Sequence, residues 1–114
     1  MVKVKICGIT HPDVAIEASM AGADAIGMVF YKPSSRYVDV QTARMIAAAM
    51  PPFVQRVGLF VDAGKAEIES ILEQVELDLL QFHGDESAEF CDAFKKAYIK
   101  AIAMKPGLDV AAKM

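Results

Sequence analysis

Hydrophobic and polar positions along this chain alternate between two patterns. Five short runs are rich in Val, Ile and Phe, which are residues that favour β-strands. Between these runs, apolar residues recur every three or four positions, as they do on one face of an α-helix. The predicted strands cover residues 2–7, 25–30, 54–61, 77–83 and 98–103. The pattern therefore predicts strands and helices in strict alternation.

Boundary residues place the helices. The first is expected to begin near Thr10, with Pro12 in its first turn and Asp13 as a capping-box partner, and to end at Gly22. The second is expected between Asp39 and the proline pair at 51–52. The remaining helix patterns are the apolar stripe Ile68, Ile71, Leu72 and Val75, the segment 86–97, and a possible start near Gly107.

The alternation predicts parallel strands covered by helices, in one α/β domain over residues 1–114. Two architectures fit this order. A flavodoxin-like open sheet is complete with five strands. A (β/α)8 TIM barrel needs eight strands and at least about 200 residues. Length alone favours the open sheet, so the choice depends on the motifs.

Composition and charge exclude several classes of protein. The formal net charge is −3, with 12 basic and 15 acidic residues, which argues against nonspecific nucleic-acid binding. No apolar run approaches the roughly 20 residues of a membrane span, and the N-terminal apolar stretch is too short for a signal peptide. Cys7 and Cys91 are far apart in the sequence, and we interpret them as reduced thiols of a cytoplasmic protein.

Reactive and recognition-type side chains gather where the predicted strands end. The first four strands end in Cys7-Gly8, in "FYKPSSRYV", in Val61-Asp62 and in "QFHGDE". The opposite ends are plainer. Ligands bind at the carboxyl ends of the strands in both candidate architectures. The sequence therefore predicts a binding or catalytic site at this edge of the sheet.

Cys7 is the first candidate in this site. Lys5 and Cys7 lie on one face of their strand, about 6.6 Å apart, while Val4 and Ile6 lie on the other. A cation at that distance favours the thiolate, which can act as a base or a nucleophile. The competing interpretation is a small hydrophobic core residue, because free cysteines are usually buried.

Three further candidates each have a structural alternative. His83 shares a strand face with Gln81 and is a candidate site residue. The alternative is a histidine that only satisfies a hydrogen bond of a loop. Arg36 suits a carboxylate or phosphate, or is simply solvated. Asp62 belongs to the site or serves only as the N-cap of a helix. Cys91 is expected in the core, and no CxxC pair, zinc-finger spacing, Walker loop, GxGxxG or GxSxG occurs.

Four segments together resemble one enzyme family. They are "VKVKICGIT", "AGADAIGMVFYKPSSRYV", "PPFVQRVGLFVD" and "LDLLQFHGDE". In this order and near this spacing, from Val2 to about Met104, they are similar to phosphoribosylanthranilate isomerase of tryptophan biosynthesis. The resemblance implies a (β/α)8 barrel and an Amadori rearrangement of N-(5-phosphoribosyl)anthranilate, with no metal or organic cofactor.

The resemblance also implies roles for particular residues. Cys7 corresponds to the general base, and a positive charge from Lys5 would tune it. Arg36 and His83 correspond to substrate-binding positions. The general acid of the family is an aspartate after roughly the sixth strand, which Asp62, Asp78 and Asp85 do not match. The resemblance thus covers about the first five-eighths of the enzyme and predicts that this chain alone is inactive.

Two other functional hypotheses stay open at this stage. One is a non-catalytic α/β fragment that associates with itself through open sheet edges. The other is a thiol-dependent enzyme that uses Cys7 as a nucleophile.

Overall fold

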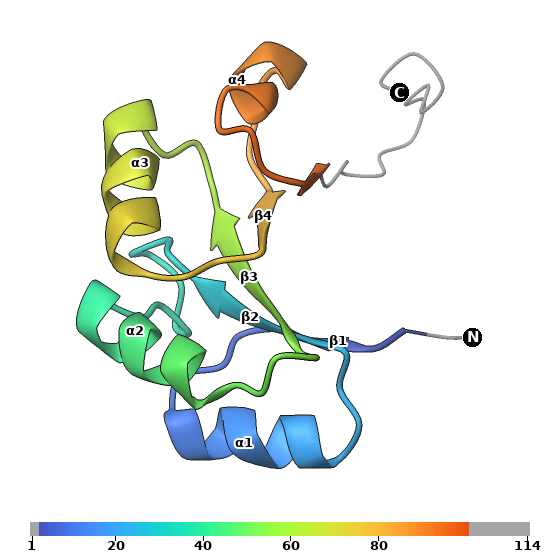
Figure 1. The fold of residues 1–114 in the computed structure, drawn as a ribbon. Helices are drawn as coiled ribbons and strands as arrows, with labels where there is room; N and C mark the ends of the chain where they lie inside the picture. Colours follow the sequence, from blue (N-terminus) through green and yellow to red (C-terminus); the bar gives the residue numbers. More distant parts are fainter. Residues whose placement is uncertain (1–2, 101–114) are drawn as a thin grey trace, which may run out of the picture.

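The computed structural model describes residues 3–100, in which five strands alternate with four helices (Figure 1). The elements are β1 (Lys5–Ile6), α1 (Pro12–Met20), β2 (Ala25–Val29), α2 (Val40–Ala49), β3 (Gln55–Phe60), α3 (Lys65–Gln74), β4 (Leu79–Phe82), α4 (Ala88–Asp92) and β5 (Tyr98–Lys100). The predicted alternation is confirmed across this range. The end of the predicted fifth strand, residues 101–103, and the possible helix near Gly107 lie outside the described residues.

The strands form one parallel sheet in the order β1-β2-β3-β4-β5. A flavodoxin-like sheet has the order 2-1-3-4-5, so that alternative is wrong. Because βα crossovers are right-handed, sequential strand order places successive helices on one side of the sheet. Figure 1 shows α1, α2 and α3 on the same side. The fold is therefore of the (β/α)8-barrel type, incomplete over the described residues.

The sheet is curved, and its concave face carries polar side chains. Lys5 on β1 donates a hydrogen bond to Gln81 on β4, although β2 and β3 lie between these strands. The contact shows that Lys5 points away from the helices. Val4 and Ile6, on the opposite face of β1, are 46% and 40% exposed.

The hydrophobic core lies between the sheet and the helices. Phe60 stacks on Phe30 at a centroid distance of 5.4 Å and lies 6.4 Å from Phe82. Phe82 in turn contacts the aromatic rings of Phe90 and Phe94 in the α4 region. These side chains pack the convex faces of β3 and β4 against the α4 region. This packing fixes the positions of the two strand ends relative to each other.

Cys91 lies in this core and is 1% exposed, as predicted. Burial is the main cause that raises the pKa of its thiol. Neither Cys91 nor Cys7 forms a disulfide. Cys91 is thus a packing residue, whereas Cys7 is only partly buried.

Two predictions at the helix ends were wrong. The N-cap of α1 is His11 and makes no side-chain capping hydrogen bond, so the expected capping box is absent, while Pro12 opens the helix as predicted. Helix α4 ends at Asp92 rather than near residue 97. The backbone of Lys95 is left-handed, with φ at 53°, and turns the chain toward β5. Gly22, with φ at 103°, follows the end of α1 as expected.

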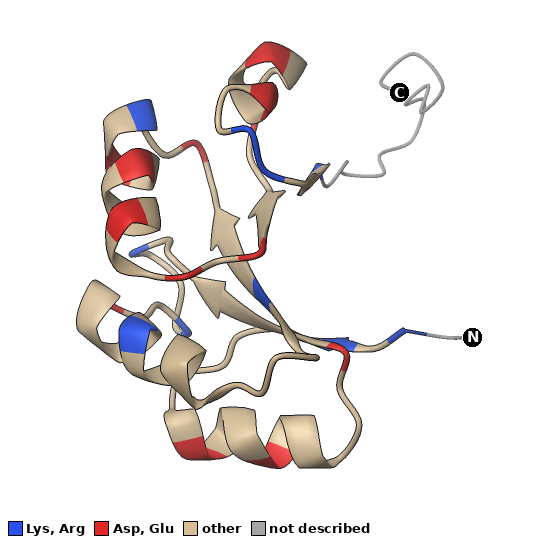
Figure 2. Cartoon of the chain, viewed as in Figure 1, with Lys and Arg blue, Asp and Glu red and all other residues tan. Residues whose placement is uncertain are grey.

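Charge is distributed unevenly over this framework. Figure 2 shows acidic residues along α3, and basic residues at β1 and beside β5. Lys5 and Lys100 belong to these two basic strands, which flank the rest of the sheet. No helix within residues 3–100 has the length and apolarity needed to cross a bilayer.

Candidate active site

Arg36 and Cys7 come together across Gly8. Nη1 of Arg36 donates a hydrogen bond to the carbonyl oxygen of Cys7 over 3.4 Å. A Cβ atom on Gly8 would lie 2.3 Å from Cδ of Arg36, and Gly8 has φ at 83°. Only glycine allows both this backbone conformation and this approach. Two residues 29 positions apart therefore meet at the end of β1.

The Cys7 thiol is partly buried above β2. A Cβ atom added to Gly27 would lie 3.1 Å from Sγ of Cys7, so the missing side chain of Gly27 provides room for the sulfur. The backbone N–H groups of Gly8 and Ile9 both donate to the carbonyl oxygen of Gly27, at 3.1 and 3.0 Å. These bonds extend the β1–β2 pairing past the strand end and hold Cys7 at the edge of the sheet.

His83 belongs to a polar chain on the concave face. Nε2 of Gln81 lies 2.7 Å from Nε2 of His83, and the ammonium of Lys5 donates to Oε1 of Gln81. The pKa of His83 is lowered, first by burial and then by the positive charges of Lys5 and Lys100, with Glu86 opposing. The structure thus gives Lys5 a direct partner in Gln81, and its tuning of Cys7 stays a prediction.

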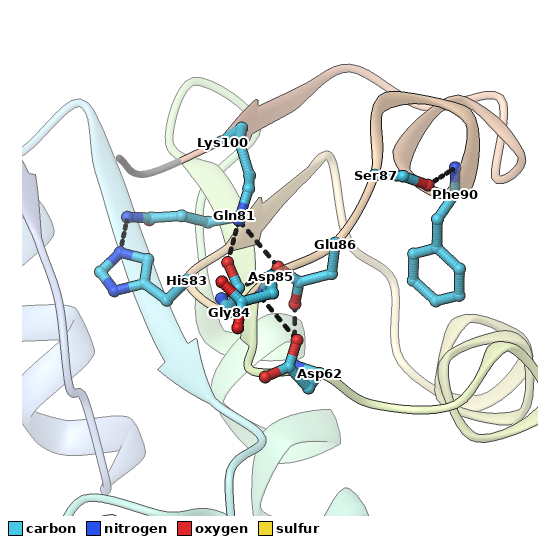
Figure 3. Close-up of polar contacts among 9 residues, drawn as sticks. All are labelled: Asp62, Gln81, His83, Gly84, Asp85, Glu86, Ser87, Phe90 and Lys100. Atoms are coloured by element: carbon cyan, nitrogen blue, oxygen red, sulfur yellow. Dashed lines mark hydrogen bonds and ion pairs between the residues drawn. The ribbon is translucent and has the colours of Figure 1, made fainter. Parts of the chain in front are cut away.

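Glu86 connects the ends of three strands (Figure 3). Its carboxylate accepts hydrogen bonds from the backbone N–H of Asp62, at 2.8 Å, and from that of Gly84, at 2.9 Å. It also accepts from Nζ of Lys100 at 3.0 Å, and only 3% of its side chain is exposed. Burial of Glu86 alone would raise its pKa. The donors, with the Asp62 N–H foremost, outweigh burial and lower that pKa.

Asp62 belongs to the same cluster and is not a helix cap. Its Oδ1 accepts from the backbone N–H of Asp85 at 2.7 Å, whereas the N-cap of α3 is Gly64. A Cβ atom on Gly84 would lie 2.4 Å from Oδ1 of Asp62. The predicted N-cap role of Asp62 is therefore wrong, because its carboxylate turns toward the loop that follows β4.

Sequence reasoning missed Glu86 and Lys100. Glu86 is the last residue of the HGDE segment, so its place in that motif was an available signal. Lys100 had none, since its contacts with Gly84 and Glu86 depend on the pairing of β4 with β5. Both residues organise the loop that follows His83.

A cavity of about 470 Å³ opens beside the strand ends. Its lining includes Tyr31, Lys32 and Tyr37 from the loop after β2, and Asp62 and Glu67 from the region after β3. Cys7, Arg36 and His83 do not line it. These three candidates therefore lie outside the cavity, which opens between the βα loops that follow β2 and β3.

The sequential parallel sheet, with its polar groups at the carboxyl ends of the strands, defines a protein of the (β/α)8-barrel class. Within this class, the model of the N-(5'-phosphoribosyl)anthranilate (PRA) isomerase family matches residues 4–114. The chain belongs to this family.

Individual relatives agree with this assignment. The chain is 57% identical over 109 residues to N-(5'-phosphoribosyl)anthranilate isomerase of Pseudomonas aeruginosa, covering 96% of this chain and 52% of that protein. It is 59% identical over 111 residues to the Pseudomonas fluorescens enzyme, covering 97% and 53%. The chain therefore spans about half the length of the curated relatives it matches.

Solved structures of such isomerases also match most of this chain and about half of their own length. Phosphoribosyl anthranilate isomerase from Thermotoga maritima matches with a TM-score of 0.85 and 44% identity, over 90% of this chain and 51% of that one. A structure of the isomerase in complex with reduced 1-(o-carboxyphenylamino)-1-deoxyribulose 5-phosphate matches with a TM-score of 0.88 and 43% identity, over 92% and 55%.

The Gly8–Arg36 contact leads to a prediction about two glycines. A left-handed backbone costs a non-glycine residue about 1–2 kcal/mol. Gly22→Ala should lose about this much free energy of unfolding, because nothing lies within 4 Å of its added Cβ. Gly8→Ala should lose more, because its Cβ also displaces Arg36. Urea unfolding, monitored by circular dichroism, measures both losses of free energy. Equal losses would contradict the tight contact between Gly8 and the side chain of Arg36.

The buried carboxylate leads to a prediction about pH. The pKa of Glu86 is lowered from its ordinary value of 4.5. Its stabilisation is therefore full above that value and is lost as pH falls through the folded-state pKa. Glu86→Gln should reduce the free energy of unfolding by about 1–3 kcal/mol at pH 7. The difference from wild type should close as pH falls below 4.5.

The control for this measurement is Glu89→Gln on α4, which removes an exposed carboxylate. It should leave the free energy of unfolding nearly unchanged at both pH values. A loss for Glu86→Gln that does not depend on pH would show that the charge of Glu86 is unimportant.

Proposed function

We propose that this chain supplies the N-terminal part of the active site of a phosphoribosylanthranilate isomerase of tryptophan biosynthesis. The reaction converts N-(5-phosphoribosyl)anthranilate into 1-(2-carboxyphenylamino)-1-deoxyribulose 5-phosphate. The observation that carries the proposal is the approach of Arg36 to Cys7 across Gly8, at the carboxyl end of β1. Family membership supports it. The proposal includes a cytoplasmic location, which suits two free cysteines.

The proposed reaction moves a hydrogen from C2 of the sugar to C1. A general acid protonates the ribose ring oxygen, and the ring opens to a Schiff base at C1. Cys7, as general base, removes the proton from C2, and an enolamine forms. The enolamine takes up a proton at C1 and tautomerises to the ketone. Acid–base steps of this kind need groups whose pKa lies near the working pH.

The other residues bind and orient the substrate in this proposal. The planar guanidinium of Arg36 can hold a carboxylate or phosphate through two parallel hydrogen bonds. His83 offers an imidazole at the end of β4, next to Gln81. Lys5 adds a positive charge on the face that carries Cys7.

The family's general acid has no counterpart among the aspartates considered. Asp78 binds Arg56 through Nε at 2.9 Å and through Nη2 at 3.2 Å, near the amino-terminal ends of the strands. This pairing lowers the pKa of Asp78, which suits a structural ion pair. The Asp62 carboxylate, after β3, accepts a hydrogen bond from the backbone N–H of Asp85 in the loop after β4. We therefore expect the 114-residue chain alone to lack turnover.

The proposed base can be tested with the two cysteines of the chain. The chain is fused to the C-terminal half of the Pseudomonas aeruginosa relative, and turnover of N-(5-phosphoribosyl)anthranilate is measured. Cys7→Ala should reduce turnover by about 10²–10⁴-fold, the usual contribution of general acid–base catalysis. Cys91→Ala is the control and should keep it.

Two results would overturn this proposal. One is a Cys7→Ala variant that keeps full activity in the fused protein. The other is turnover by the 114-residue chain alone at the rate of a full-length relative. Exchange of the C2 hydrogen with solvent, without a trapped adduct on Cys7, separates a base from a nucleophile.

The sheet edges favour a second candidate, a non-catalytic fragment that associates with itself. Within the described residues, β1 and β5 each pair on one side only. Val4, Ile6 and Ile99 on these strands are 40–46% exposed. Open strand edges template pairing with another chain. A second copy of the chain is the proposed occupant.

Sedimentation tests this candidate. The chain, at 12.3 kDa, should form dimers or larger assemblies, and Val4→Lys with Ile6→Lys should shift it toward the monomer, because lysines block edge pairing. Met45→Lys on α2, at a site that is 55% exposed, is the control and should keep the assembly. A monomer at every concentration would rule this candidate out.

A further inference from the structure

Lys5, Gln81 and His83 form a hydrogen-bonded chain across the concave face of the sheet. Lys5 lies on β1, Gln81 on β4, and His83 directly after β4. The Lys5 ammonium contacts Oε1 of Gln81. Nε2 of Gln81 lies 2.7 Å from Nε2 of His83 (Figure 3). The order of donors and acceptors along this chain determines where the imidazole proton sits.

Lys5 fixes the orientation of the Gln81 amide. An ammonium group only donates hydrogen bonds, so the Gln81 atom that faces it must be the amide oxygen. The amide NH₂ then faces His83, and an NH₂ group also only donates. Nε2 of His83 must therefore accept, which requires a lone pair on that nitrogen. A ring with a free lone pair on Nε2 is neutral and carries its proton on Nδ1.

We propose that Lys5 and Gln81 hold His83 as the neutral Nδ1–H tautomer, whose one N–H is a hydrogen-bond donor for an oxygen atom of a bound ligand. Nδ1 is the ring nitrogen that does not face Gln81, and no partner for it is seen within residues 3–100. The identity of the ligand oxygen, a sugar or phosphate oxygen of the substrate, rests on the proposed function. The assignment of the tautomer does not depend on the proposed function.

The charges around His83 act in the same direction. Lys5 from β1 and Lys100 from β5 place positive charge near the ring, and Glu86 from the following loop opposes them. Burial is the largest cause that lowers the pKa of His83, and the two lysines add to it. Protonation of Nε2 would also set two donors against each other at the Gln81 contact. The ring therefore donates one hydrogen bond without carrying charge at neutral pH.

Nitrogen NMR of the 114-residue chain tests the tautomer directly. Two-dimensional ¹⁵N–¹H spectra distinguish a ring nitrogen that carries a proton from one that carries a lone pair. At neutral pH, His83 should show a protonated Nδ1 and an unprotonated Nε2. His11, the other histidine of the chain, is exposed and is the internal reference. The titration midpoint of His83 should lie below the ordinary histidine value of 6.5.

Variants then test the cause. Lys5→Met frees the Gln81 amide to turn over, so the His83 spectrum should move toward a mixture of tautomers. Lys3→Met, at an exposed position two residues earlier, should leave the spectrum unchanged. Gln81→Glu places a carboxylate against Nε2, which should protonate that nitrogen and raise the midpoint above the wild-type value. A predominant Nε2–H tautomer in the wild type, or no response to Lys5→Met and Gln81→Glu, would overturn the proposal.

The donor role is tested in the fused protein. His83→Asn keeps a side-chain N–H near the place of Nδ1 and should retain most of kcat/KM. His83→Leu removes the donor and should lose about tenfold, as for one hydrogen bond worth roughly 1.4 kcal/mol. Equal losses in both variants would exclude the donor role. Absence of turnover in the unmutated fusion would count against the proposed function and leave the NMR result intact.

Discussion

The buried carboxylate of Glu86 sets the relative positions of three strand ends. It binds the backbone N–H groups of Asp62 and Gly84 and the ammonium of Lys100, which come from the segments after β3 and β4 and from β5. Nearly all of its side chain is removed from water, so each donor is needed to offset the cost of burying a charge. Together with the Asp62 carboxylate and the Lys100 ammonium, this group holds the loop after β4, which begins at His83.

Glycines allow side chains from distant parts of the chain to approach the backbone closely at the strand ends. Gly8 lets the side chain of Arg36 pass over the end of β1, and Gly84 lets the carboxylate of Asp62 lie against the loop after β4. Gly27 leaves room for the sulfur of Cys7. In each case, a side chain from elsewhere in the chain occupies the space that a Cβ atom would fill. The polar edge of the sheet is therefore densely packed, although its residues come from distant parts of the sequence.

The concave face adds a hydrogen-bonded chain to apolar residues such as Leu59, the β3 partner of Gln81, whereas the convex face is packed with apolar side chains. Aromatic rings from Phe30 to Phe82 join the strands to the helices on the outside. On the inside, Lys5 reaches over two strands to Gln81 and His83. The curvature of the sheet makes this reach possible, and the same curvature turns the carboxyl ends of the strands toward one another. Fold and candidate chemistry thus have a common geometric origin.

Local rules were sufficient for the elements of this protein and for the edge of the sheet that carries its polar residues. Periodicity located the strands and helices, because apolar spacing reflects which face is buried. Strand alternation put Lys5 and Cys7 on one face of their strand, and Gln81 and His83 on one face of theirs. The motifs around Cys7, Arg36 and His83 indicated the family, which the comparisons confirmed.

Tertiary structure alone decided the rest. The alternation along the chain fits a barrel-type sheet and a flavodoxin-like one; the family resemblance implied the first, and only the order β1-β2-β3-β4-β5 excluded the second. The Asp62 carboxylate turned away from its helix because a loop 23 residues later offered a better partner. Lys5 bound Gln81, 76 residues away. No local pattern encodes such contacts, because they form only when a curved sheet brings distant strands face to face.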